Sequence, residues 1–492
     1  MEHSAGRIVK NTIIFTAALL VQKIIAFGNF LYLSSNLSPS VLGGYVWALS
    51  FTTMFGIISD LGLSYILIRD ASKDQKDDEK YFQNVLGLKL PLIAAALISC
   101  LAVLFATKSD PQVIALVLLS SALMVFDGFS IIFYSFLRAK QLLSYESLGV
   151  IGFQIISFAG AVIALMNGKN ITGVMAALAF AGFVNCLYSG IVFRKNFKFK
   201  FRPRLEKNMV AYFFRLMPAF ALSGIFVRIY NASDSVILGY MKGDAAVGLF
   251  SIPAKAVTAF QALIPGAFAA TIYPSMANFY ATSREKLVSL FEKSFNYLSL
   301  IAAPLAIGLY VVAEPVMQFI WPKYIGAVST FQIMALALPF IFLAFPTGHL
   351  LRACDKQNIN TVNRGIIMLL SVVLNLILVY YYGVFGAGIT FLIVNIILLA
   401  ADLVYVGKII DYSRKNIIWY NFKVLLASFL MAVSVLASLK YLAFYFAIVI
   451  GIIIFIIACW ALKILNKKEL SFLVESIKVK KITKDEDIAD HN

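Results

Sequence analysis

Long runs of apolar residues dominate the chain, and short polar segments separate them. The run Leu442–Leu462 contains no charged residue and is about as long as a helix that crosses a bilayer, which needs roughly twenty residues. A transmembrane barrel would instead show alternating segments of about ten residues. The pattern therefore predicts an all-α membrane protein with about fourteen transmembrane helices. We expect these helices at residues 11–33, 41–66, 82–107, 112–136, 145–167, 171–193, 212–240, 245–276, 289–313, 325–350, 362–382, 384–407, 418–438 and 441–463.

The distribution of positive charge predicts how these helices are oriented. Of the 42 Lys and Arg residues, 33 fall on the side that carries both termini, five fall in the loops of the opposite side, and four lie within spans. Cytoplasmic loops of membrane proteins carry such an excess of Lys and Arg. We therefore expect an even number of spans, with the N-terminus and the C-terminus both in the cytoplasm.

Composition excludes several classes of protein. With 61% hydrophobic and 14% charged residues, the chain has too few charges to cover a soluble protein of 492 residues. The net charge of +17 comes from loop cations, so we expect no nucleic-acid partner. Four cysteines without a C-x-x-C pair and three scattered histidines predict no disulfide framework, no metal site and no cofactor. The apolar run at 11–33 is too long for the core of a cleavable signal peptide.

An internal repeat organises the chain into halves. A shift of 205 residues aligns similar residues of the two halves, namely Lys10 with Arg215, Lys23 with Arg228, Asn29 with Asp234, Gly43 with Gly248, and Tyr45 with Phe250. The cations recur at the same depth of the first and seventh helices. Six helices separate equivalent spans, so the halves form a parallel repeat with a cavity between them. We predict an N-lobe at 1–207 (helices 1–6), a C-lobe at 208–412 (helices 7–12), two additional helices at 413–465 and a polar cytoplasmic tail at 466–492.

The connection between the halves is basic and aromatic. Residues 194–207 contain seven cations, with Phe197, Phe199 and Phe201 between them. Two interpretations stay open: this segment binds anionic lipid headgroups, or it is a connecting loop that is positive only because it is cytoplasmic.

Three cations lie within predicted spans of the two halves. Lys23 lies about ten residues from either end of the first helix, too deep for its ammonium group to reach the interface, and Arg228 and Lys255 lie in the seventh and eighth. The intramembrane acids are Asp60, Asp127, Asp234 and Asp402. In one interpretation these acids balance the cations or couple transport to an ion. In the other, Lys23, Arg228 and Lys255 form a substrate site in a central cavity, where a pyrophosphate would bind.

Several segments resemble the bacterial polysaccharide transporters of the O-antigen flippase type. The segment Leu37–Tyr45 is similar to their first external turn and second helix, as are Asp60–Leu63 and Leu67–Arg69. Leu351–Lys356, Asn375 and Gly383–Ala387 are similar to their tenth-to-twelfth helix region. The resemblance implies the fold of the multidrug/oligosaccharidyl-lipid/polysaccharide exporter superfamily, with two six-helix lobes and alternating access. By analogy with related lipid II flippases, it also implies a groove for the lipid tail at the last two helices.

The resemblance implies that the substrate is an undecaprenyl-pyrophosphate-linked oligosaccharide, a repeat unit of O-antigen or another polysaccharide, moved across the bacterial inner membrane. The expected partners are this lipid-linked oligosaccharide, membrane lipids and the polysaccharide polymerase machinery. One alternative is a cation-coupled multidrug exporter, for which Asp60 and Asp127 are the candidate coupling residues. Another is a membrane enzyme acting on lipid-linked sugars, although the short external loops leave little room for a catalytic domain.

Overall fold

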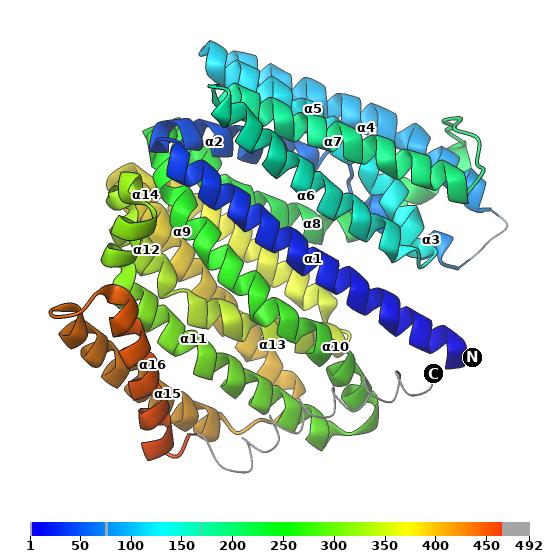
Figure 1. Ribbon diagram of the computed structural model, residues 1–492. Coiled ribbons are helices and arrows are strands. Elements are labelled where there is room, and N and C mark those ends of the chain that lie inside the picture. Colours follow the sequence, from blue (N-terminus) through cyan, green and yellow to red (C-terminus); the bar gives the residue numbers. More distant parts are fainter. Residues whose placement is uncertain (1, 74–76, 169, 465–492) are drawn as a thin grey trace, which may run out of the picture.

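The computed structural model describes residues 2–73, 77–168 and 170–464, and it contains helices and no strand over these residues (Figure 1). Lys76 and Lys169, and the predicted tail at 466–492, lie outside the described residues. The helices of the first half are α1 (Glu2–Asn36), α2 (Pro39–Gly56), α3 (Leu63–Ala71), α4 (Asp78–Thr107), α5 (Pro111–Ala139), α6 (Leu143–Met166) and α7 (Ile171–Asn196). Those that follow are α8 (Lys207–Lys242), α9 (Asp244–Leu263), α10 (Pro265–Thr282), α11 (Arg284–Ile320), the 3₁₀ helix η1 (Pro322–Ala327), α12 (Val328–Ala335), α13 (Leu338–Ala353), α14 (Gln357–Ile409), α15 (Arg414–Leu439) and α16 (Phe444–Ala461).

The chain is a multi-pass membrane protein. Ten of the described helices are long and apolar enough to cross a membrane, and the bent pair Pro322–Ala335 and Leu338–Ala353 brings the number to eleven. Helix α14 contains two of the predicted spans, 362–382 and 384–407, on either side of Gly383, which has a φ of 56°. A Cβ on Gly386 would lie 2.0 Å from the carbonyl oxygen of Leu378, eight residues earlier. Residues eight apart in a straight helix are about 12 Å apart, so α14 folds back on itself at Gly383. The full count of fourteen crossings, and the cytoplasmic position of both ends, stay predictions.

Two further predicted spans are broken helices. The span at 41–66 is divided into α2 and α3, with Gly62 at φ 82° between them. The span at 245–276 breaks at Pro265, which begins α10, whereas Pro253 is accommodated inside α9. Pro265 has no backbone N–H to donate, so the helical hydrogen-bond ladder is interrupted at this point. Breaks of this kind within a membrane occur where the backbone is buried or lines a cavity.

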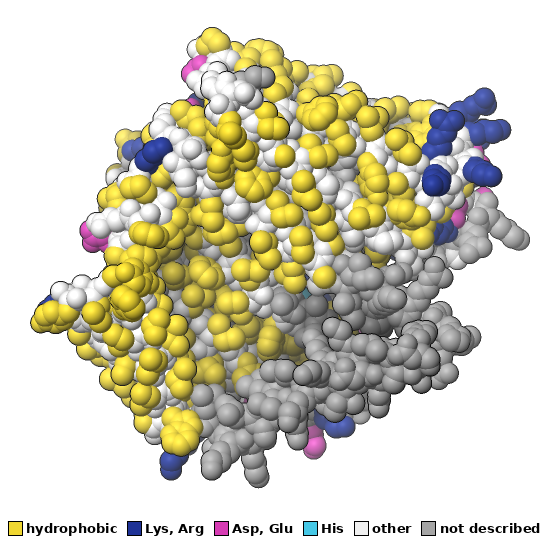
Figure 2. Space-filling model, viewed as in Figure 1, with side chains coloured by type: hydrophobic (Ala, Val, Ile, Leu, Met, Phe, Trp, Pro, Cys, Tyr) yellow, Lys and Arg dark blue, Asp and Glu magenta, His cyan; other side chains and the backbone are white. Residues whose placement is uncertain are grey.

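The two halves of the chain lie on either side of α1 (Figure 1). Helix α1 packs against α6 of the first half and α9 of the second, and α2 packs against both α8 and α9. Helices α15 and α16 pack on α11 at the outer edge of the second half. In Figure 2, hydrophobic side chains cover the flank of the molecule, and Lys and Arg gather near one end. The boundaries of the predicted lobes stay predictions.

Helices α2 and α9 approach each other through a reciprocal pair of glycines. A Cβ on Gly43 would lie 1.7 Å from the carbonyl oxygen of Asp244, and a Cβ on Gly248 would lie 1.9 Å from that of Pro39. The fifth residue of each helix is therefore a glycine, and it packs against the first residue of the other helix. The shift of 205 residues converts one contact into the other, which is the relation that a two-fold axis produces between equivalent parts.

Further contacts join the halves at the same end, which the charge distribution predicts to be external. The indole of Trp321 donates to Ser34 (2.9 Å), Lys323 donates to the carbonyl of Ser35 (3.0 Å), and the Tyr324 hydroxyl donates to the carbonyl of Leu37 (3.2 Å). The indole of Trp47 donates to the carbonyl of Val236 (3.3 Å). These bonds and the glycine pair hold the ends of α1 and α2 against the second half.

Candidate functional site

A cavity of about 880 Å³ lies between the halves, and we call it the central cavity. Lys23 of α1, Arg228 of α8 and Lys255 of α9 all line it, so the structure brings the three cations singled out from the sequence into one space. The side chains of Lys23 and Lys255 are exposed in it, and Arg228 is half-buried. Lys23 and Lys255 interact repulsively, because both carry positive charge.

These cations form no ion pair among the residues that the structure describes, although Arg228 attracts Asp60 and Asp127 at longer range. The ion pairs found there involve other side chains, and Arg228 makes one long hydrogen bond, 3.5 Å, to the carbonyl of Gly56. Placing an unpaired cation near the middle of a membrane is costly, and such residues normally face a wet cavity or a charged ligand. The arrangement is therefore able to attract an anion.

The remainder of the central cavity is mostly apolar. Polar atoms come from few side chains, among them Asn29, Asn231 and Gln154, and the side-chain oxygen of Asn29 has no hydrogen-bond partner in the described part of the chain. The apolar lining includes Phe27, Phe30, Leu31, Val46, Phe260, Leu263 and Phe331. A ligand that combines an anionic group with a long apolar group would match both kinds of surface.

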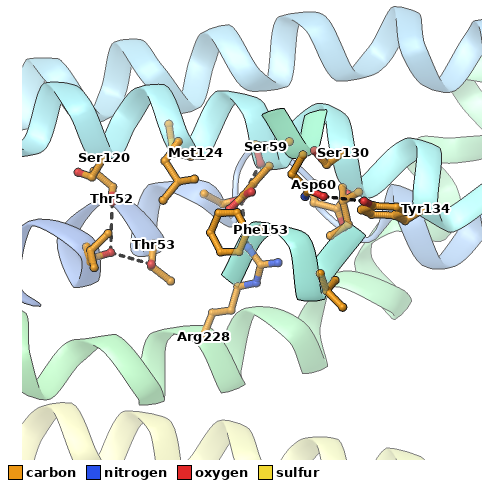
Figure 3. Close-up of a pocket in the computed structure, with 18 of the residues that line it drawn as sticks. Thr52, Thr53, Ser59, Asp60, Ser120, Met124, Ser130, Tyr134, Phe153 and Arg228 are labelled. Atoms are coloured by element: carbon orange, nitrogen blue, oxygen red, sulfur yellow. Dashed lines mark hydrogen bonds between the residues drawn. The ribbon is translucent and has the colours of Figure 1, made fainter. Parts of the chain in front are cut away.

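A second cavity of about 450 Å³ extends into the first half (Figure 3), and we call it the N-half pocket. Its wall combines apolar side chains, such as Met124 and Phe153, with the polar side chains of Asp127, Tyr134, Asn185, Thr52 and several serines. Arg228 enters from α8 and lines both cavities, as do Leu49 and Thr53. Arg228 thus lies where the two cavities meet.

The four aspartates differ in their surroundings. Asp60 accepts hydrogen bonds from Lys89 (2.6 Å) and Ser64 (2.5 Å), Asp234 accepts one from Asn375 (2.5 Å), and Asp402 accepts one from Asn363 (2.8 Å). Asp127 has no such partner among the described residues, and it faces the N-half pocket. Of the acids considered from the sequence, Asp60 and Asp127 line a cavity, whereas Asp234 and Asp402 are buried and hydrogen-bonded to asparagines.

Sequence reasoning assigned no role to several polar residues that the structure places at this site. Lys89 is fully buried and forms the ion pair with Asp60, and Arg138 forms one with buried Glu146 beside the N-half pocket. The hydroxyl of Tyr134 donates to Asn185 at 2.6 Å. The sequence does contain a signal for the pair of Lys89 and Asp60, namely a lysine within the apolar run 82–107 and an aspartate in the preceding span. Opposite charges in adjacent membrane helices tend to pair.

Replacing Lys89 by methionine should destabilise the protein, because it leaves the Asp60 carboxylate with no cation in a buried site. Removing one partner of a buried ion pair lowers the free energy of unfolding by about 3–5 kcal/mol, whereas removing both charges is often nearly neutral. We expect a clearly lower midpoint of thermal unfolding in detergent for Lys89→Met, and recovery of most of it in Lys89→Met/Asp60→Asn. Lys80→Gln, which breaks the exposed pair with Glu206, is the matched control and should change the midpoint little. Equal midpoints for Lys89→Met and the wild type would contradict a structural ion pair.

The part of the chain that the structure describes holds no cluster of three or more His, Cys, Asp or Glu residues arranged to bind a metal. The polar groups at the site can bind and orient a ligand through charge and hydrogen bonds.

Comparisons with known proteins extend this picture. A family model described as polysaccharide biosynthesis protein matches residues 8–280, just over half of the chain. An uncharacterized membrane protein of Methanocaldococcus jannaschii is 24% identical over 488 residues, covering 90% of this chain and 94% of the relative. A candidate O-antigen transporter of Escherichia coli is 30% identical over 116 residues, which is 23% of this chain and 28% of that protein.

Solved structures show the same fold at low sequence identity. The lipid II flippase MurJ in an inward closed conformation superposes with a TM-score of 0.75 and 16% identity, covering 91% of this chain and 98% of MurJ. An inward-facing multidrug resistance transporter of the MATE family, in the MOP superfamily, superposes with a TM-score of 0.64 and 14% identity, covering 82% of this chain and 94% of the transporter.

Proposed function

Because this chain belongs to the polysaccharide biosynthesis protein family, we propose that it is a flippase for undecaprenyl-pyrophosphate-linked oligosaccharides. It moves the repeat units of O-antigen or another polysaccharide from the inner to the outer leaflet of the bacterial inner membrane. The observation that carries this proposal is the set of unpaired cations from both halves, Lys23, Arg228 and Lys255, in one largely apolar cavity.

The chemistry of the central cavity matches the parts of such a substrate. A pyrophosphate between Lys23 and Lys255 would relieve their mutual repulsion, and Arg228 can bind phosphate oxygens with two parallel hydrogen bonds. The apolar wall suits the start of the polyprenyl chain, and the N-half pocket beyond Arg228 offers hydroxyl, amide and carboxylate groups to the sugars. The remainder of the lipid tail would pass along α15 and α16, whose outward faces are rich in exposed Ile, Leu and Phe.

The same arrangement supports transport by alternating access. The halves are held together at the end predicted to be external, so a rocking motion that opens this end and closes the other would expose the cavity to each side in turn. If both termini are in the cytoplasm, as the charge distribution predicts, the closed end is external and the substrate would be loaded from the cytoplasmic leaflet. Polymerase proteins would receive the oligosaccharide on the other side.

A cation-coupled exporter is the second candidate, and Asp127 favours it. An aspartate without a hydrogen-bond or ion-pair partner among the described residues, in a pocket within the membrane, is able to bind a proton or a metal cation. In that case the substrate would be a drug-like molecule rather than an anionic lipid. We propose no catalytic step in either case.

A transport assay in proteoliposomes tests the proposal. Vesicles would contain the purified protein and an undecaprenyl-pyrophosphate-linked oligosaccharide, with exposure of the sugar followed by cleavage with an added glycosidase. We expect the glycosidase to cleave more than half of the lipid-linked oligosaccharide only when the protein is present. Protein-free vesicles and the same oligosaccharide on a neutral polyprenyl ether are the controls. Export of a cationic dye without movement of the lipid-linked sugar would favour the second candidate and contradict the first.

A further inference from the structure

The connection between α7 and α8 has a two-residue alternation of aromatic and cationic side chains. Residues 197–204 read Phe-Lys-Phe-Lys-Phe-Arg-Pro-Arg, and the segment is neither helix nor strand in the structure. In extended backbone, alternate side chains point to opposite faces. In the structure Lys198, Lys200, Arg202 and Arg204 are exposed, whereas Phe197 and Phe199 are partly buried and Phe201 is 42% exposed. The alternation is therefore kept from Phe197 to Lys200, and after it the backbone turns where the amide of Arg202 donates to the carbonyl of Lys200 (2.8 Å). We call these four cations, with Arg194 at the end of α7, the basic strip.

The phenylalanines anchor the basic strip to the first half. Phe82 of α4 stacks on Phe193 of α7 with ring centroids 4.4 Å apart, and Phe201 meets Phe82 edge-on at 5.6 Å. Phe197 and Phe199 both contact the ring of Phe136, with centroids 4.9 and 5.4 Å away. Aromatic pairs of this kind contribute beyond the area they bury, so the aromatic face of the segment is held in place.

Hydrogen bonds fix the backbone of the same segment against the start of α4. The amide of Lys200 donates to Glu79 (3.1 Å), the amide of Arg204 donates to the carbonyl of Gln83 (3.1 Å), and the amide of Glu206 donates to Asn84 (2.8 Å). Gly87 permits this close approach, because a Cβ there would lie 2.0 Å from the carbonyl oxygen of Arg204. A loop that is basic only to orient the protein needs its charges but not a fixed backbone.

The exposed cations of the basic strip border a concave site of about 530 Å³. Arg194, Lys198 and Lys200 line it, and Phe199 and Phe201 supply its apolar part. None of the ion pairs found among the described residues includes these three cations, and the nearby acids are engaged elsewhere: Glu79 accepts hydrogen bonds from Lys200 N–H and Gln83, and Glu206 pairs with Lys80. Lys and Arg side chains gather near one end of the molecule, beside the hydrophobic flank (Figure 2).

We propose that the basic strip is a binding site for the phosphate headgroup of an anionic phospholipid in the cytoplasmic leaflet. Three cations without acidic partners supply the charge for a phosphodiester. The phenylalanines favour a lipid over free phosphate, because they offer an apolar surface to the glycerol and the first acyl carbons. The site is separate from the central cavity and does not depend on which substrate that cavity carries. Of the two interpretations that the sequence leaves open for residues 194–207, the pre-formed geometry supports the lipid site.

Lipid binding to the purified full-length protein tests this inference. Native mass spectrometry would measure the affinity for palmitoyl-oleoyl phosphatidylglycerol, with phosphatidylcholine of the same chains and inorganic phosphate as separate probes. We expect tight binding of phosphatidylglycerol alone, and a loss of about tenfold or more in Lys198→Gln/Lys200→Gln, since each cation near a membrane surface contributes to lipid affinity. Lys198→Arg/Lys200→Arg keeps the charges and should keep the affinity, and an unchanged midpoint of thermal unfolding in Lys198→Gln/Lys200→Gln would show that this variant folds.

A second double variant separates a built site from general attraction. Lys356→Gln/Lys415→Gln removes two exposed cations that are also predicted to be cytoplasmic but lie in the second half. It should leave the affinity for phosphatidylglycerol within about twofold of the wild type, because neither cation belongs to the basic strip. Equal losses in the two Gln pairs, or equal affinities for phosphatidylglycerol and phosphatidylcholine, would overturn the proposal. Binding of inorganic phosphate as tight as that of phosphatidylglycerol would overturn the assignment to a lipid.

Discussion

Replacing Lys23 or Arg228 by glutamine should reduce transport of the lipid-linked oligosaccharide by about tenfold to a hundredfold while the protein still inserts in the membrane. A hydrogen bond to a charged group contributes roughly 1.5–3 kcal/mol, and losing it weakens binding by one to two powers of ten. Both side chains line the central cavity and form no ion pair among the described residues, so their loss removes attraction for the substrate and breaks no ion pair.

The measurement is the initial rate of sugar exposure in proteoliposomes, corrected for the amount of protein. Lys23→Arg keeps the charge and should retain part of the activity, although the guanidinium is planar and bulkier. Lys440→Gln, which removes an exposed cation in the turn between α15 and α16, is the matched control and should transport normally.

A double variant separates substrate binding from a structural role for Arg228. The sequence made Asp234 a candidate for balancing Arg228, but the structure places Asp234 against Asn375. The acid to test is Asp127, which lines the N-half pocket together with Arg228. If Arg228 only balances this acid, Arg228→Gln/Asp127→Asn should restore transport. If Arg228 binds the pyrophosphate, the double variant should be as inactive as Arg228→Gln, and full rescue would refute the binding role.

Adding a single methyl group at Gly43 or Gly248 should abolish most transport by preventing the predicted external ends from closing. Each new Cβ would lie 1.7 or 1.9 Å from a carbonyl oxygen of the opposite helix, and this contact is between backbones, so no side chain can move aside. Overpacking of this kind costs typically 1–3 kcal/mol or more, enough to change the ratio of closed to open ends by about tenfold to a hundredfold. Because the two contacts are equivalent under the repeat, Gly43→Ala and Gly248→Ala should have similar effects.

Cysteine labelling reports the position of this gate. In a background without the four native cysteines, Ser34→Cys should be protected from a membrane-impermeant maleimide, because Ser34 is buried against Trp321. The same cysteine should react in the presence of Gly43→Ala or Gly248→Ala. Gly152→Ala on α6 is the matched control, since a Cβ there meets nothing within 4 Å, and it should leave both transport and protection unchanged. Normal transport with continued protection of the cysteine in Gly43→Ala would show that the glycine pair is not part of a moving gate.

Part of the candidate site follows from the sequence, because the cost of placing a charge in lipid is large and local. Lys23, Arg228 and Lys255 stand out as cations within apolar runs, and the structure brings all three to one cavity. The sequence does not show that Asp60 pairs with Lys89 or that Asp234 meets Asn375. Those contacts depend on the rotation of each helix about its axis and on the breaks at Gly62 and Pro265, which hydropathy does not record.

The sequence by itself determined that this is a multi-pass helical membrane protein. Bilayer thickness sets the length of the apolar runs, and the absence of water in the bilayer requires the backbone groups of each span to bond within their own helix. It also determined the 205-residue correspondence, because equivalent positions kept similar residues. Only the tertiary structure decided that Gly43 and Gly248 form one reciprocal contact, that Arg228 lies where two cavities meet, and that Phe197 to Phe201 hold a line of cations in place. These features join residues far apart in the chain, and they arise from packing between helices, which no local pattern of residues encodes.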